Sequence, residues 1–140
     1  MHTTNYVHTF IAVAEDCPAE VGTVPPERKT PSVAMLTYRA LADAPYSRDS
    51  DAVIFGVFAD RKEIPAAERD DARATFFSKG QACLRASDLG RRYGWGTHHD
   101  GEGRVALVGR ETPEYARLLG GEAPDGTPVK VVRAMRSKRG

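Results

Sequence analysis

The chain has 140 residues, the length of one ordinary domain, which is long enough to bury a core without disulfides or metal ions. A hydrophobic share of 41% excludes a wholly disordered chain, and no apolar run approaches the roughly 20 residues that span a bilayer. The net charge is only +1, but residues 1–78 hold 8 Lys and Arg against 12 Asp and Glu, whereas residues 79–140 hold 12 against 7. The second part therefore favours anionic partners.

The first predicted element is a strand at residues 6–14 (YVHTFIAVA), because the stretch is rich in β-branched and aromatic residues. Its apolar side chains fall on both faces, which indicates a strand covered on both sides. Residues 16–31 follow, rich in proline and without periodicity. A segment of this length without regular structure is uncommon inside a compact domain, so we expect either a functional flap or an ordered surface wrap.

Two helices are predicted next. A Thr-Pro pair at residues 30–31 supplies an N-cap and a first-turn proline for a helix that ends before Pro45. Ser50 and Asp51 start a second helix, in which apolar residues recur at helical spacing over residues 53–58. The same run also fits a buried strand. The helix is favoured because a capping signal precedes the run and basic residues follow it.

Three further helices follow along the chain. Residues 65–77 have acidic residues early and Gly80 as a stop signal. Ser87 caps a short helix that runs through Arg92, and Thr112 with Pro113 opens another that ends at Gly120.

The segments on either side of Asp100-Gly101-Glu102-Gly103 form a predicted β-hairpin. A two-residue or a four-residue loop pairs His99 with Arg104 and His98 with Val105. This register places His98 beside aliphatic side chains and leaves His99 exposed beside Arg104.

The last predicted strand spans residues 126–136, and residues 136–140 form a basic tail that we expect to be frayed and solvated. There is no regular alternation of strands and helices. We therefore predict an α+β fold for residues 1–140, a single domain with a small, mostly antiparallel sheet packed with several helices.

Several strings along the chain are specific when taken together: MHTTNY, TFIAVAEDCP, VPPERKT, FFSKGQACLRAS, RRYGWGTHHDGEGRVAL and AMRSKR. They resemble, in order and over nearly the whole chain, an uncharacterised family of small single-domain bacterial and fungal proteins, a domain of unknown function. In that pattern Pro often stands at position 82, here Ala82, and an apolar residue at position 97, here Thr97. The resemblance implies a shared fold and brings no activity, cofactor or catalytic residue with it.

Residues 79–100 gather cations, a thiol, imidazoles and aromatic rings, the groups from which binding sites are built. We predict that a small anionic or planar ligand binds there, with these contacts: Lys79, Gln81, Arg85, Arg92, Tyr93 and Trp95. Trp95, flanked by two glycines, is either a core side chain or a stacking platform. The prediction depends on Cys83, Trp95 and His98 lining one common hollow.

The alternative is a small thiol-dependent enzyme or redox sensor, with Cys83 as nucleophile and His98 as base. Against it, free cysteine is most often an inert buried side chain, and His98 also fits a buried neutral imidazole. Whether the protein is an enzyme stays open.

Several classes of site and partner are not expected. No metal-ligand spacing, phosphate-binding loop or serine hydrolase motif occurs, so we predict no metal and no cofactor. The near-neutral net charge argues against nucleic acid as a partner, and a homo-oligomer is compatible with the sequence. Two cysteines, Cys17 and Cys83, are too few for a disulfide scaffold, and residues 1–5 do not resemble a secretory signal. We therefore expect a cytoplasmic protein with reduced thiols and no membrane partner.

Overall fold

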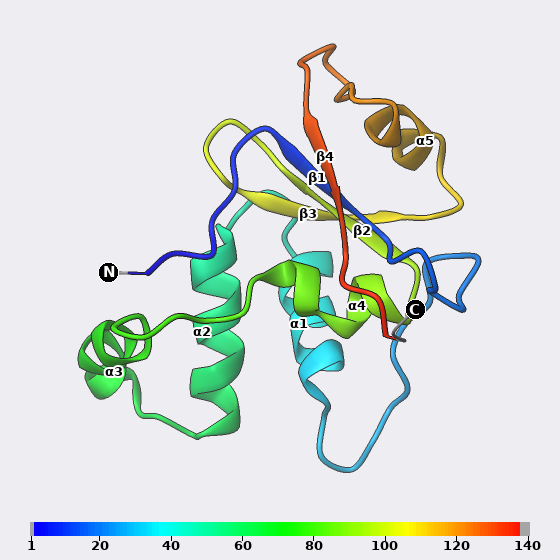
Figure 1. The fold of residues 1–140 in the computed structure, drawn as a ribbon. Coiled ribbons are helices and arrows are strands. Elements are labelled where there is room, and N and C mark those ends of the chain that lie inside the picture. The colour runs from blue at the N-terminus through cyan, green and yellow to red at the C-terminus, as the bar shows by residue number, and fades with distance from the viewer. Residues whose placement is uncertain (1, 138–140) are drawn as a thin grey trace.

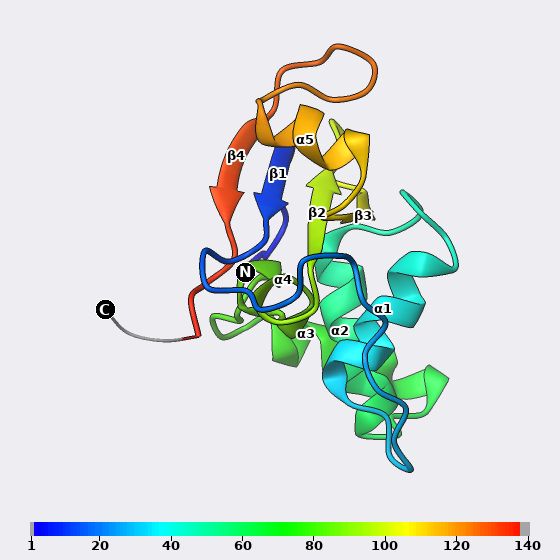
Figure 2. The ribbon, with the colours of Figure 1, turned by 90° about the vertical axis from the view of Figure 1, so that its right-hand side faces the viewer.

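A computed structural model describes residues 2–137 (Figure 1). Within this range the elements, in chain order, are β1 (Thr9–Ala12), α1 (Val33–Ala42), α2 (Ser50–Arg61), η1 (Ala66–Glu68), α3 (Arg69–Phe76), η2 (Leu84–Ala86), α4 (Asp88–Arg91), β2 (Trp95–His99), β3 (Val105–Gly109), α5 (Pro113–Leu119) and β4 (Lys130–Arg133). Figures 1 and 2 show α5 at one end of the sheet and α1 to α4 grouped toward the other. The predicted α+β fold is confirmed.

The four strands are ordered β3-β2-β1-β4. Both the β3–β2 and the β2–β1 pairings are antiparallel, but the last strand, β4, pairs with β1 in parallel. The sheet is thus mixed. A parallel pair needs a long crossover, and here the chain between β1 and β4 contains α1 to α5 and the β2–β3 hairpin.

The central strand β1 is buried along its whole length, as its apolar faces predicted. Phe10 is fully buried, and its ring meets the ring of Tyr115 from α5 edge-on at a centroid distance of 5.1 Å. Opposite, β2 approaches so closely that a Cβ at Gly96 would lie 2.5 Å from the Phe10 ring. Only glycine fits there, because core packing leaves no room for another carbon.

Local signals fix most helix starts. The 53–58 run is helical, within α2, whose N-cap Asp49 accepts a hydrogen bond from the Ala52 N–H. Ser87 and Thr112 cap α4 and α5 as predicted. The predicted cap of α1 is wrong by two residues, because the Ser32 hydroxyl, not Thr30, accepts the bond from the Met35 N–H.

The predicted helix at residues 65–77 is divided. A single 3-10 turn (η1) comes first, and α3 then ends at Phe76. Gly80 is not its stop: Phe77 is the C-cap, is buried, and donates its N–H to the Arg73 carbonyl. Packing of aromatic rings between α2 and α3 therefore decided the end of this helix.

The predicted hairpin exists, but its register is wrong by one residue. His99 pairs with Val105 and His98 pairs with Ala106. The loop holds three residues, because Asp100 still donates its N–H to the Arg104 carbonyl and Gly103 adopts a left-handed φ of 79°. A type I turn followed by a left-handed glycine is the usual three-residue hairpin loop, and it shifts the pairing by one.

The proline-rich segment, residues 16–31, contains no helix or strand and runs past the strand ends before following α1 (Figure 2). Hydrogen bonds hold its first half: the Thr23 N–H donates to the Tyr93 carbonyl, and the Trp95 Nε1–H donates to the Thr23 carbonyl. Gly94, with a φ of 78°, lies against the Val21 carbonyl, where a Cβ would clash. This half is an ordered wrap.

The C-terminal end of the described chain is tied to the loop after β1. The Ser137 N–H donates to the Asp16 carboxylate, and Arg136 lies 4.0 Å from Glu15. Residues 138–140 of the predicted basic tail lie outside the described residues. Within residues 2–137, no helix combines the length and apolar character needed to cross a bilayer.

Candidate functional site

Three arginines from distant parts of the chain line one hollow of about 430 Å³, which we call the arginine groove. Arg28 comes from the proline-rich segment, Arg61 from the last turn of α2, and Arg92 from the end of α4. The first residues of α1 and the Tyr93 ring complete the walls. One carboxylate, Asp88, also lies in the groove, so cations outnumber anions.

The start of α1 adds to the positive potential of the groove. Ser32, Val33 and Ala34 line it, and the first N–H groups of a helix have no partner inside the helix. The Ser32 hydroxyl satisfies only the Met35 N–H. The helix dipole therefore acts in the same direction as the guanidinium groups.

The three arginines are not equally engaged. Arg92 lies 3.8 Å from Asp88 in an exposed ion pair and also lies over the Tyr93 ring, 5.6 Å from its centroid. Arg28 and Arg61 form no ion pair with any residue in the described range. Two of the three guanidinium groups thus have no ion-pair partner within residues 2–137.

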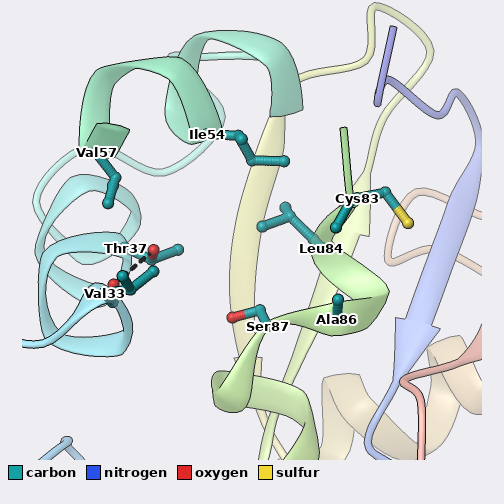
Figure 3. Close-up of a pocket in the computed structure, with 9 residues that line it drawn as sticks. Val33, Thr37, Ile54, Val57, Cys83, Leu84, Ala86 and Ser87 are labelled. Atoms are coloured by element: carbon teal, nitrogen blue, oxygen red, sulfur yellow. Dashed lines mark hydrogen bonds between the residues drawn. The ribbon is translucent and has the colours of Figure 1, made fainter. Parts of the chain in front are cut away.

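A second hollow, of about 170 Å³, lies between α1, α2 and η2, and we call it the apolar hollow (Figure 3). Its walls are mainly carbon, from side chains that include Val33, Thr37, Ile54, Val57, Leu84 and Ala86. The Thr37 hydroxyl is already used, since it donates to the Val33 carbonyl at 2.8 Å. Figure 3 shows the Cys83 sulfur pointing away from Ile54 and Leu84.

On its other side Cys83 borders the N-terminal groove, a hollow of about 300 Å³ that residues 2–6 and Gln81 also line. The Cys83 sulfur lies 3.2 Å from the Tyr6 hydroxyl. Burial, together with this contact, raises the pKa of Tyr6 to about 12. The tyrosine therefore stays protonated as a neutral partner of the sulfur.

His98 lines a separate small hollow of about 50 Å³, the histidine hollow, together with His8, Asp100 and Asp125. Its Nδ1 forms a 2.8 Å hydrogen bond with the Tyr46 hydroxyl. Burial lowers the pKa of His98, and the nearby Asp100 and Asp125 carboxylates oppose that shift without cancelling it. His98 is therefore a neutral, buried imidazole near pH 7.

His99 is fully buried, contrary to the predicted exposure beside Arg104. The shifted register turns its ring to the other face, where it meets the Tyr6 ring edge-on at 5.4 Å. Burial and the neighbouring His98 lower the pKa of His99 to about 4. Its Nδ1 has no hydrogen-bond partner in the described chain.

Residues 1–140 match the family described as Family of unknown function (DUF6157). The chain belongs to this family. The predicted membership of an uncharacterised family is therefore confirmed, and it brings no known activity with it. No curated protein and no solved structure matches the chain.

In this DUF6157 member the residues of the predicted common hollow are separated. Cys83 borders the apolar hollow and the N-terminal groove, whereas His98 lines the histidine hollow. Trp95 donates its Nε1–H to the Thr23 carbonyl and packs by Tyr38. The predicted gathering is wrong because the hairpin register and the wrap direct these side chains to different parts of the molecule.

The other predicted ligand contacts of the DUF6157 chain also lie in different parts of the molecule. Arg92 and Tyr93 lie together in the arginine groove, whereas Gln81 lines the N-terminal groove. Arg85 donates its Nε–H to the Arg133 carbonyl, and Lys79 is exposed. Sequence reasoning missed Arg28 and Arg61. Both lie in the acidic first half, and no local pattern marks them.

Over residues 2–137, no group of three or more His, Cys, Asp and Glu is arranged to hold a metal ion. Both cysteines are free thiols, with Cys17 buried and Cys83 partly so.

Proposed function

We propose that this protein binds a small anionic ligand in the arginine groove. The observation that carries the proposal is the convergence of Arg28, Arg61 and Arg92 on one hollow at the start of α1, where two of the three guanidinium groups have no ion-pair partner in the part of the chain that the structure describes. Arg92 and Tyr93 are the predicted contacts that this proposal retains.

The chemistry of the groove suits a phosphate or a carboxylate. A guanidinium presents parallel N–H donors that match the oxygens of either group. The free N–H groups of Val33 and Ala34 offer further donors, and an anion there is stabilised by the helix dipole. The exposed Arg92 and its Tyr93 ring form a flat surface at the edge, on which a planar group can stack.

The test is a titration with inorganic phosphate at low salt, followed by amide chemical shifts of residues 32–34. We expect saturable shifts there, and each of Arg28→Ala and Arg61→Ala to weaken binding about tenfold. Arg104→Ala is the matched control, because Arg104 pairs with Glu102 at the hairpin loop and does not line the groove. Absence of shifts, or an equal loss in the Arg104 variant, would overturn the proposal.

The thiol alternative is not proposed. A nucleophilic cysteine needs a base or a cation that lowers its pKa, and the predicted base, His98, lines a different hollow and bonds Tyr46. The group at the sulfur of Cys83 is instead the hydroxyl of Tyr6, which burial keeps protonated. It cannot act as a base near pH 7.

A further inference from the structure

The arginine groove and the apolar hollow adjoin along three elements. Val33 of α1 lines both. On α2, Val57 lines the apolar hollow and Arg61, one turn later on the same side, lines the arginine groove. At the start of α4, Ser87 lines the first and Asp88 the second. The cationic site and the apolar one therefore share Val33 and have neighbouring lining residues on α2 and α4.

The residue that lines both hollows presents apolar surface to water. Val33 is 49% exposed, and several other valines of the described chain are exposed to a similar degree. Burying exposed carbon is favourable by roughly 25 cal/mol per Å². A ligand that crosses Val33 covers this carbon, whereas a bare anion in the arginine groove leaves it in water.

The size and lining of the apolar hollow limit what enters it. A dry engineered cavity of roughly 150 Å³ accepts a benzene-sized guest, and this hollow has about 170 Å³. The Thr37 hydroxyl donates its proton to the Val33 carbonyl, and the Ser87 hydroxyl accepts from the Leu89 N–H. The rest of the lining is mainly carbon, so a polar guest would regain few of the hydrogen bonds that it makes with water.

We propose that the ligand is amphipathic: a small molecule with one phosphate or carboxylate head and a compact apolar body about the size of one aromatic ring. The head binds Arg28 and Arg61, and the body lies across Val33 in the apolar hollow. This inference rests on the proposed function, because it assigns the class of ligand for the same arginine groove.

The experiment compares three probes with the same head: inorganic phosphate, glycerol 3-phosphate and phenyl phosphate. We expect phenyl phosphate to bind at least about tenfold more tightly than glycerol 3-phosphate, because only the ring gains by leaving water. Equal affinities of the two esters would overturn the amphipathic ligand while leaving the anion site intact. If none of the three binds, the proposed function itself fails.

A filling variant separates the two hollows. Ala86→Leu places a larger side chain in the apolar hollow, and we expect it to remove the preference for phenyl phosphate but keep the affinity for inorganic phosphate. Ala116→Leu, on the exposed side of α5, is the matched control and should keep the preference. Circular dichroism checks folding, and Ala82→Leu, on the same lining, replaces the first variant if that one fails to fold. A preference that survives filling overturns the proposal.

Discussion

The histidine pair on β2 and the arginine groove use charged and titratable groups in opposite ways. His98 and His99 are 6% and 0% exposed, and each ring contacts a tyrosine. Arg28 and Arg61 are exposed, and neither has an ion-pair partner in the described chain.

The difference shows where a function is to be sought. Burial favours the neutral form of an imidazole and so lowers its pKa in the folded state. Because the two histidines pack in the interior, this lowered pKa makes the free energy of unfolding depend on pH. An exposed guanidinium contributes little to stability and keeps its donors available for a ligand. Changes at the pair should therefore alter unfolding, and changes at the groove should alter binding.

The largest expected effect comes from the pKa of His99. In the unfolded chain His99 binds a proton near its ordinary pKa of 6.5, whereas in the folded chain its pKa is about 4. The unfolded state thus binds more protons between these values, so stability is present above pH 6.5 and lost as pH falls toward 4. We expect a loss of about 3 kcal/mol across this window, measured by urea unfolding at a series of pH values.

The control is His99→Gln, which is uncharged and should lose most of that pH slope whatever its stability at pH 7. The pKa of His98 is lowered as well, so this variant should keep a residual dependence of stability on pH. A wild-type free energy of unfolding that stays constant from pH 6.5 to pH 4 would contradict the burial of the pair.

A smaller effect is expected from Tyr46→Phe. This change removes the hydroxyl bonded to His98 Nδ1 and leaves a buried polar atom without its partner. The expected loss is about 1–2 kcal/mol in the free energy of unfolding, measured by urea denaturation at pH 7.5. Tyr38→Phe is the matched control, because no hydrogen bond of the Tyr38 hydroxyl occurs in the described chain. Equal losses in the two variants would show that the Tyr46–His98 hydrogen bond does not stabilise the fold more than any tyrosine hydroxyl does.

The smallest effect belongs to the groove. Arg28→Ala and Arg61→Ala should each change the free energy of unfolding by no more than about 0.5 kcal/mol, because both side chains are exposed and neither forms an ion pair within residues 2–137. Thermal and urea unfolding in the absence of ligand measure it. A loss above 2 kcal/mol in either variant would mean that the arginine is structural, and the contrast with the histidine pair would disappear.

Short-range signals in the sequence were sufficient for much of the fold. Ser87 and Thr112 predicted two helix starts, and the 53–58 run was assigned to a helix from its flanking residues. These signals work because a cap acts within three or four residues of itself. The cap of α1 was displaced by two residues because two hydroxyl residues, Thr30 and Ser32, lie close enough in the sequence for either to fit that role.

The hairpin shows the limit of such signals. Its turn was predicted from the Asp-Gly-Glu-Gly sequence, but the register depended on whether Gly103 adopts a left-handed conformation. A shift of one residue in the register exchanged the faces of His98 and His99. As a result His99 is buried, where the predicted register left it exposed.

The sequence by itself determined the family, the α+β class and the positions of most helices and strands, because these depend on nearby residues and on recurring strings. Only the tertiary structure decided the parallel partner of β1, the separation of Cys83 from His98, and the arginine groove. The groove joins residues 28, 61 and 92, which are more than 30 positions apart in the chain. Such convergence is set by how helices and loops pack on the sheet, and no local pattern encodes it.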